Sequence, residues 1–145
     1  MKLVEIYTDG ACSGNPGAGG WAAILSFNGV SKEISGGEDN TTNNRMELLA
    51  IIKGLSALKE PCKVKLYSDS QYAVSAFTNG YLNNWINSGW RLADKKPVKN
   101  QDLWQQLDEL SSTKTLHWVW VKGHAGEDMN ERVDTLARDA ATALK

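Results

Sequence analysis

Apolar and polar positions alternate over short stretches in the first third of the chain and follow helical spacing over longer stretches afterwards. Apolar-rich runs on either side of Asn28-Gly29 predict a β-hairpin, because Asn-Gly is a preferred two-residue turn. Met46, Leu49, Ile52 and Leu55 recur at the spacing of one helix face, and Pro61 ends that pattern. We expect strands at residues 2–9, 21–27, about 30–36, 63–68 and 114–121, and helices at 43–58, near 70–78 and 80–87, 101–111 and 127–143. The glycine-rich segment 10–20 is predicted to be a turn.

The order of these elements sets the expected fold class. Strands come first and helices then alternate with strands, which is typical of an α/β or mixed α+β fold with a mixed sheet. No linker, low-complexity tract or internal repeat interrupts the chain. Its 145 residues therefore predict a single domain, residues 1–145.

Two predicted strands end in the same pattern, an apolar residue, Tyr, a hydroxyl residue, Asp and a small residue. The first copy ends at Asp9-Gly10 and the second at Asp69-Ser70. If the two strands lie parallel and adjacent, both carboxylates emerge at the sheet edge where open α/β folds bind ligands. The alternative is that both are ordinary turn or cap aspartates.

Two further acids lie on predicted helices beside apolar positions. Glu47 shares a helix face with Ala50, Ile51, Gly54 and Leu58, and an unpaired charge buried there would be costly. It could instead complete a capping box with Asn44 or pair with Arg45 or Lys53. Asp134 borders the apolar stripe of the last helix, and an ion pair with Arg138 one turn later is its alternative role.

Taken together, the four carboxylates favour a metal site over four separate structural roles. Converging carboxylates repel and raise one another's pKa values. Hard divalent cations relieve that repulsion, because Mg²⁺ prefers oxygen ligands and is often shared with phosphates. Two such ions about 4 Å apart could hold the attacking and leaving oxygens of a phosphoryl transfer.

Composition excludes several classes of protein. Apolar residues make up 41% and charged residues 23% of the chain, as in globular rather than disordered proteins. No apolar run approaches the length of a membrane span or a signal peptide, so we expect a cytoplasmic protein. Cys12 and Cys62 form no disulfide framework or zinc motif. With a net charge of −1, binding to nucleic acid requires that the basic residues cluster.

Five motifs in order give the chain a resemblance to a known family. They are Tyr-Thr-Asp-Gly-Ala-Cys-Ser-Gly-Asn-Pro-Gly at 7–17, Thr-Asn-Asn-Arg-Met-Glu-Leu at 42–48, Tyr-Ser-Asp-Ser-Gln-Tyr at 67–72, Asp-Lys-Lys-Pro-Val-Lys-Asn at 94–100, and Val-Lys-Gly-His-Ala-Gly at 121–126 followed by Asn-Glu-Arg-Val-Asp at 130–134. The sequence resembles the bacterial type 1 ribonucleases H (ribonuclease HI) from about residue 3 to residue 140.

The resemblance implies a ribonuclease H-like fold, with a five-stranded mixed sheet flanked by helices. It implies hydrolysis of the RNA strand of an RNA–DNA hybrid duplex by two Mg²⁺ ions, with Mn²⁺ as a substitute, leaving 5′-phosphate and 3′-hydroxyl ends. Asp9, Glu47, Asp69 and Asp134 match the metal ligands, and His124 matches a loop histidine that assists proton transfer or product release. An exposed loop histidine without a role is the alternative for His124, whereas His117 is expected to be structural.

The same resemblance implies a set of substrate-binding residues. Cys12, Asn15, Asn43, Asn44 and Gln71 would read the minor groove and the RNA 2′-hydroxyls, which that wide groove presents. Thr42 matches a phosphate contact to the DNA strand. A basic protrusion at residues 80–100 would hold the duplex through Trp85, Trp90, Lys95, Lys96 and Lys99. The alternative is a solvated helix and loop with core tryptophans.

This chain departs from the family's pattern at Ile86-Asn87-Ser88, where well-known bacterial members are strongly basic. We therefore expect weaker and more salt-sensitive binding of hybrids.

A proofreading exonuclease is disfavoured because Asp9-Gly10-Ala11 lacks a second acid, and 145 residues leave no room for the extra domains of a transposase. Two alternatives remain, a non-catalytic hybrid-binding module and a ribonuclease H domain excised from a reverse transcriptase. No assembly interface is evident, so we expect a monomer.

Overall fold

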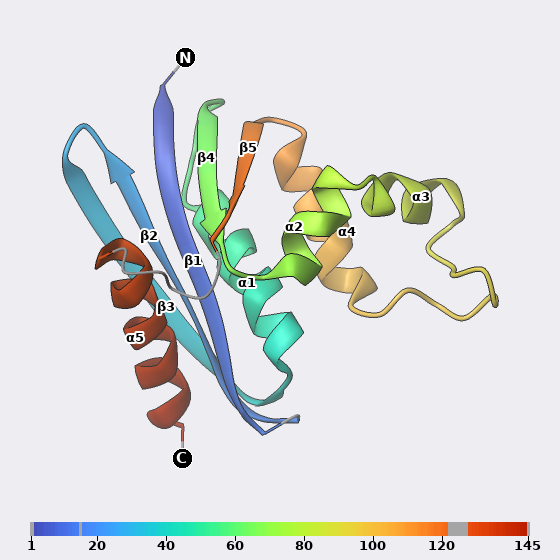
Figure 1. The fold of residues 1–145 in the computed structure, drawn as a ribbon, viewed down its shortest axis with the longest axis horizontal. Helices are drawn as coiled ribbons and strands as arrows, with labels where there is room; N and C mark the ends of the chain where they lie inside the picture. The colour runs from blue at the N-terminus through green and yellow to red at the C-terminus, as the bar shows by residue number, and fades with distance from the viewer. Residues whose placement is uncertain (1, 15, 122–127, 145) are drawn as a thin grey trace.

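The computed structural model describes residues 2–14, 16–121 and 128–144, which form one five-stranded sheet with helices on both faces (Figure 1). The strands are β1 (Leu3–Gly14), β2 (Gly17–Phe27), β3 (Val30–Thr41), β4 (Lys63–Ser68) and β5 (Thr115–Trp120). Their order across the sheet is β3-β2-β1-β4-β5. The pairs β3–β2 and β2–β1 are antiparallel, whereas β1–β4 and β4–β5 are parallel. The expected mixed sheet is therefore confirmed.

The helices form two layers of unequal size. They are α1 (Asn43–Ser56), α2 (Gln71–Thr78), α3 (Tyr81–Asn87), α4 (Gln101–Ser111) and α5 (Asp128–Thr142). Figure 1 shows α5 alone on one face, across β1, β2 and β3, and α1 and α4 on the other face. The segment containing α3 and the following loop projects sideways, away from the sheet.

Each helix layer has its own apolar core. The larger core lies between α1, α4 and the sheet and includes Ile6, Leu66 and the fully buried Trp104. The smaller core lies under α5 and includes Ile24 and Val133. Because successive strand residues face opposite sides, β1 sends its even-numbered apolar residues to the larger core, whereas Tyr7 and Ala11, and with them Asp9, face α5.

The prediction of a turn over residues 10–20 is wrong. β1 continues to Gly14 and β2 begins at Gly17, so the chain reverses only between these two residues. The glycines serve helix packing instead. A Cβ atom at Gly10 would lie 2.4 Å from the backbone nitrogen of Glu47, and one at Gly20 would lie 2.1 Å from the carbonyl oxygen of Ala137. Small residues therefore let α1 and α5 approach the sheet from opposite faces.

The remaining elements follow the sequence pattern with small shifts at their ends. Asn28 and Gly29 both have positive φ angles, 51° and 78°, as a tight hairpin turn between β2 and β3 requires. β3 extends to Thr41, five residues beyond its predicted end. Helix α1 ends at Ser56 rather than at residue 58. In the described part of the chain, we find no helix that is both long and apolar enough to span a membrane.

Candidate active site

Two aspartates meet at the ends of neighbouring parallel strands. Tyr7 of β1 pairs with Tyr67 of β4, and the two rings stack with their centroids 4.4 Å apart. Asp9 and Asp69 each follow two residues later. The backbone carbonyl of Asp69 accepts a hydrogen bond from Trp120 Nε1 (3.2 Å), which ties this turn to the end of β5. The repeated sequence pattern thus corresponds to a repeated position in the sheet.

Glu47 reaches the same point from the other layer. The N-cap of α1 is Thr42, whose hydroxyl accepts a hydrogen bond from the Arg45 backbone nitrogen (3.3 Å). The capping box with Asn44 considered from the sequence is therefore not formed. Arg45 pairs with Asp102 and Lys53 lies over the ring of Trp21, so neither cation is committed to Glu47. Because β4 ends at Ser68 while β1 continues, the first turn of α1 has access to Asp9 past the end of β4.

The three carboxyl groups form a compact cluster. Asp9, Glu47 and Asp69 each place an oxygen within 4.8 Å of the other two. Asp9 is 2% and Glu47 5% exposed. Burial, with the charges of Asp69 and Asp134 next in importance, raises the pKa of Asp9 to about 8. Burial and the adjacent Asp9 carboxyl raise the pKa of Glu47 well above its ordinary value.

Asp134 lies at the edge of this cluster. Its carboxyl lies close enough to Asp9 to raise the pKa of Asp9. It is also hydrogen bonded to Arg138, one turn further along α5, so the ion pair considered from the sequence exists. Asp134 therefore lies beside Asp9 but outside the group of three, and one of its oxygens is held by a cation.

The donor set fits a divalent cation. No donor in the described residues reaches the buried Oε2 of Glu47. A buried carboxylate oxygen without a partner is costly, and a hard cation with a preference for oxygen would satisfy it. The same cation would offset the repulsion that raises the pKa values of Asp9 and Glu47.

A polar pocket lies beside the cluster at the first turn of α1. It has a volume of about 360 Å³ and is lined by Thr42, Asn43, Asn44, Lys99 and Asn100. The sequence predicts the first four of these as substrate-binding residues but does not single out Asn100. The available signal was the position of Asn100 directly before helix α4, where its φ angle of 60° favours asparagine over most other residues.

Comparison with known proteins identifies the family. The ribonuclease H family model matches residues 1–142. The chain belongs to the ribonuclease H family. It is therefore an enzyme of the class that its motifs predict.

Close relatives carry the same family name across almost the whole chain. The ribonuclease H of Mesorhizobium japonicum is 59% identical over 144 residues, covering 99% of this chain and 81% of the relative. The ribonuclease H of Rhodopseudomonas palustris strain TIE-1 is 60% identical over 142 residues, covering 98% and 91%. The crystal structure of LC9-RNase H1, a type 1 RNase H with the type 2 active-site motif, has a TM-score of 0.89 and 30% identity, covering all of this chain and 74% of that one.

The other predicted minor-groove residues surround the cluster at greater distance. Cys12 is half-buried on β1, and its thiol lies 3.4 Å from the carbonyl oxygen of Thr41. Gln71 begins α2 directly after the turn of Asp69 and is exposed. Asn15 and His124 lie outside the described residues. His117 lies in β5, as expected, with an exposed side chain.

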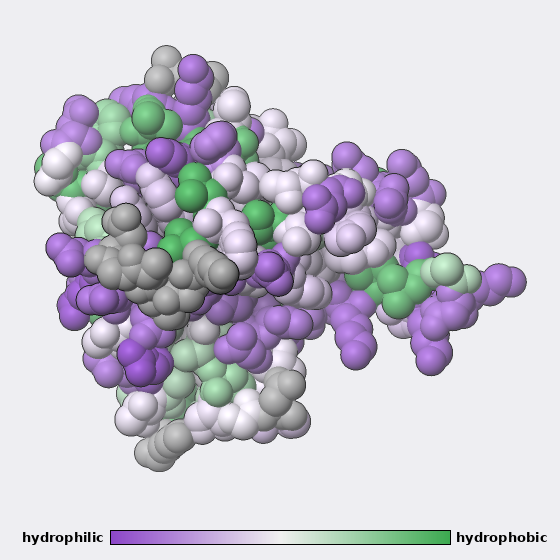
Figure 2. All heavy atoms as spheres, viewed as in Figure 1, coloured by the Kyte–Doolittle hydropathy of each residue, from purple (hydrophilic) through white to green (hydrophobic). Residues whose placement is uncertain are grey.

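The predicted basic protrusion corresponds to α3 and the loop that follows it. Lys95, Lys96 and Lys99 are exposed on this segment. Figure 2 shows its projecting end as mainly hydrophilic around a small apolar patch. Three non-glycine residues with positive φ angles, Trp90, Lys95 and Asn100, shape its course together with Gly89.

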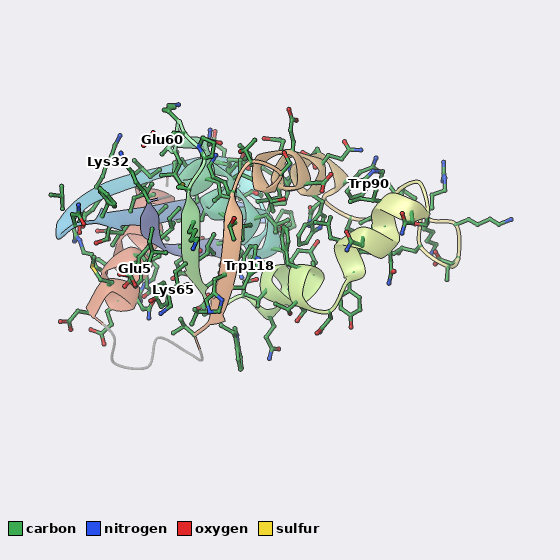
Figure 3. All side chains as sticks on the ribbon, turned by 90° about the horizontal axis from the view of Figure 1, so that it is seen from above. Glu5, Lys32, Glu60, Lys65, Trp90 and Trp118 are labelled. Atoms are coloured by element: carbon green, nitrogen blue, oxygen red, sulfur yellow. The ribbon has the colours of Figure 1, made fainter. Side chains whose placement is uncertain are left out.

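The two tryptophans of the protrusion have a packing role in this structure. The ring of Trp85 lies 5.2 Å from that of Trp104, centroid to centroid. Trp90 is also partly buried against the larger core, on the segment that projects beyond the sheet in Figure 3. Both observations match the core tryptophans considered as an alternative, and each ring remains partly accessible to a ligand.

Proposed function

We propose that this member of the ribonuclease H family is an endonuclease that hydrolyses the RNA strand of RNA–DNA hybrids, with residues 1–145 as one catalytic domain. The products would carry 5′-phosphate and 3′-hydroxyl ends. The observation that carries the proposal is the group formed by the buried Asp9 and Glu47 and the half-buried Asp69, where β1, the end of β4 and α1 meet. Relatives about 59% identical that are named ribonuclease H support the same activity. We further propose a cytoplasmic monomer.

Asp9, Glu47, Asp69 and Asp134 are the proposed ligands of two Mg²⁺ ions, for which Mn²⁺ can substitute. Such ions would activate the attacking water and stabilise the departing 3′-oxygen. The chain supplies a rigid frame for them. The backbone nitrogen of Gly10 donates to Asp9 Oδ1 (2.9 Å), and β5 holds the turn that carries Asp69. Asp134, whose carboxylate is shared with Arg138, is the ligand whose position can adjust most readily.

His124 is proposed to assist proton transfer or product release near this site. An unperturbed histidine has a pKa of about 6.5, which suits proton movement near neutrality. Replacement of His124 by alanine should therefore reduce activity partially, whereas loss of a carboxylate should abolish it.

The substrate would cross the cluster between the pocket at α1 and the glycine-rich end of β1. Thr42 and Lys99 line the pocket and offer a hydroxyl and a cation to a backbone phosphate of the DNA strand. Asn43, Asn44 and Gln71, with Cys12 and Asn15, would contact the minor groove and the RNA 2′-hydroxyls. Lys95 and Lys96, with the partly exposed rings of Trp85 and Trp90, would contact the duplex further along.

A cleavage assay on a hybrid with a labelled RNA strand tests the proposal. The purified protein is incubated with Mg²⁺, with EDTA, and as the variants Asp9→Asn and Asp69→Asn. Asp139→Asn, an exposed acid elsewhere on α5, is the matched control. Cleavage should require the metal and both aspartates and should persist in the control. Cleavage that survives EDTA or either substitution would overturn the assignment, as would cleavage confined to single-stranded RNA.

A further inference from the structure

Asn100 is held in one orientation by two side chains from different helices. Its Oδ1 accepts a hydrogen bond from Arg45 Nη1 of α1 (3.2 Å). Its Nδ2 donates to the hydroxyl oxygen of Tyr72 on α2 (3.1 Å). The same hydroxyl oxygen accepts a second hydrogen bond from Trp104 Nε1 of α4 (3.0 Å). Three helices thus meet at one amide.

The chemistry of Arg45 determines which way the amide faces. A guanidinium group donates hydrogen bonds and cannot accept them, so the amide oxygen and not the nitrogen must face Arg45. Arg45 is itself fixed by two hydrogen bonds to the carboxylate of Asp102, at 3.0 and 2.8 Å. A flipped amide would set its N–H groups against a cation. Asn100 therefore has a single favourable orientation.

Tyr72 connects this amide to the rigid interior. Its ring packs against Trp104, with the ring centroids 5.3 Å apart, and Trp104 is fully buried. Asn100 lies in the left-handed backbone region, and its carbonyl accepts the backbone N–H groups of Leu103 and Trp104 at the start of α4. Backbone and side chain of Asn100 are thus both anchored at the wall of the polar pocket.

The amide nitrogen has a second N–H, which makes no hydrogen bond to any residue within the described part of the chain. With its oxygen bound to Arg45, Asn100 contributes a donor rather than an acceptor to the pocket that it shares with Thr42 and Lys99. A hydroxyl, an ammonium and an amide N–H together suit a phosphate oxygen. An acceptor at this position would repel the same group.

We propose that Tyr72 and Arg45 are positioning residues that hold the Asn100 amide with its N–H toward a backbone phosphate of the hybrid. This inference rests on the proposed function and adds residues that touch no substrate atom. Tyr72 acts through its hydroxyl oxygen and Arg45 through the donor-only character of its guanidinium.

Tyr72→Phe is the sharpest test, because it removes one oxygen atom, changes no charge and keeps the ring against Trp104. The variant loses the hydrogen bond between Tyr72 and the Asn100 amide, which should weaken the proposed hydrogen bond from that amide to the phosphate. We expect the KM for hybrid to rise about threefold to tenfold and kcat to remain nearly unchanged. Ser111→Ala, which removes a hydroxyl at the far end of α4, is the control and should leave KM unchanged.

A double-mutant cycle separates positioning from general packing. In the Asn100→Ala background there is no amide to orient, so Tyr72→Phe should have no further effect on KM. An equal rise in KM in both backgrounds would show that Tyr72 acts elsewhere and would overturn the inference. A wild-type KM for Tyr72→Phe in the Asn100 background would overturn it as well.

Arg45→Lys is the second variant, since lysine keeps the charge but cannot form the fork that reaches both Asn100 and Asp102. It should raise KM, whereas Asp102→Asn, which leaves Arg45 and Asn100 in place, should change KM less.

Hybrids with one neutral methylphosphonate linkage, in either the DNA or the RNA strand, locate the phosphate. The sensitive linkage should lie in the DNA strand and should matter less in Tyr72→Phe; no linkage with this behaviour in either strand would refute the proposal. If the wild-type protein cleaves no hybrid, the proposed function fails. If it cleaves hybrid but Tyr72→Phe and Arg45→Lys have the same KM as the wild-type protein, only this inference fails.

Discussion

The carboxyl groups of Asp9 and Glu47, one from β1 and one from α1, lie within 4.8 Å of each other where both side chains are buried. The close approach depends on Gly10, because any larger residue there would separate the strand from the first turn of the helix. Two acids held together in this way destabilise the fold in their charged forms. The cluster therefore stores unfavourable energy that a bound cation would release.

Replacement of Glu47 by glutamine should make the protein more stable and almost inactive. Glutamine keeps the shape of the side chain but removes one of the interacting charges. In EDTA at pH 8 we expect the midpoint of thermal unfolding to rise by several degrees, because a domain of about 150 residues gains about 2–4 °C for each kcal/mol of added stability. Hybrid cleavage in Mg²⁺ should fall about 100-fold or more, because a metal site contributes several kcal/mol.

Glu109→Gln, at an exposed position on α4, is the control for this experiment and should change neither quantity. A fall in the unfolding midpoint of Glu47→Gln in EDTA would show that Glu47 makes a net stabilising contact. The stored-energy account of the cluster would then be wrong.

Stability of the metal-free protein should decrease as the pH rises. The pKa of Asp9 is about 8 in the folded protein and that of ordinary aspartate is 3.8, so between these values the folded state binds a proton that the unfolded state releases. This contribution is fully present below about pH 4 and is lost as the pH approaches 8. Denaturant titrations in EDTA at pH 5 and pH 8 measure it.

Asp9→Asn should flatten this dependence, because asparagine does not titrate. Added Mg²⁺ should restore stability to the wild-type protein at pH 8 but to a lesser extent in the variant. A wild-type protein whose pH dependence equals that of Asp9→Asn would contradict the raised pKa.

Gly10→Ala should disturb both fold and site. The added Cβ atom would lie 2.4 Å from the backbone nitrogen of Glu47 and 2.5 Å from the carbonyl carbon of Met46, so α1 must shift away from β1. We expect a loss of about 1–3 kcal/mol, as for other overpacked cores, together with loss of cleavage. Gly29→Ala is the control, because a Cβ atom at this hairpin turn would have no heavy atom within 4 Å. It tests backbone strain alone and should retain activity. Equal stability of Gly10→Ala and wild type would mean that α1 tolerates the shift.

The parts of the site that follow from local pattern were predictable from the sequence. The matching ends at Asp9 and Asp69 required only that two strands be parallel neighbours, and the pairing of Tyr7 with Tyr67 confirms that. Glu47 on an apolar helix face could be recognised as unusual, and its burial confirms this. These features depend on side-chain periodicity, which the sequence displays directly.

Features that depend on contacts between distant segments were not predictable in the same way. The glycines of residues 10–20 resemble a turn, and only the approach of α1 and α5 shows that they belong to strands. The role of Asn100 depends on Tyr72 and Arg45, which are 28 and 55 residues away in the sequence. Trp85 gives no sign in the sequence that Trp104 lies against it.

Added charge on the protrusion should strengthen binding of the hybrid. Ile86 and Asn87 are exposed on α3, so lysine at both positions adds charge without loss of packing. Ser88 should be left intact, because its hydroxyl lies within hydrogen-bond distance of the carbonyl oxygens of Trp85 (3.1 Å) and Arg91 (2.8 Å) and can donate its proton to either. We expect the double variant to lower the Kd severalfold at low salt and to steepen the dependence of log Kd on log salt by about one to two units. By the same relation the natural chain, with fewer phosphate contacts, should bind more weakly and with a shallower salt dependence than the sequence comparison alone suggests.

Thr113→Lys, on the exposed turn before β5, controls for net charge. Binding titrations at several salt concentrations, with EDTA to prevent cleavage, measure the effect. If the double variant and the control bind alike, the protrusion does not contact the hybrid.

The four acids are contributed by β1, α1, the turn that follows β4, and α5, so they are spread over the chain from residue 9 to residue 134. No subset of these elements holds the complete set, and α5 comes last of the four along the chain. A chain that is partly synthesised or partly folded lacks at least one of the four proposed ligands. The proposed metal site would thus be complete only after both helix layers have docked, so an immature copy of the chain would bind a hybrid without cleaving it.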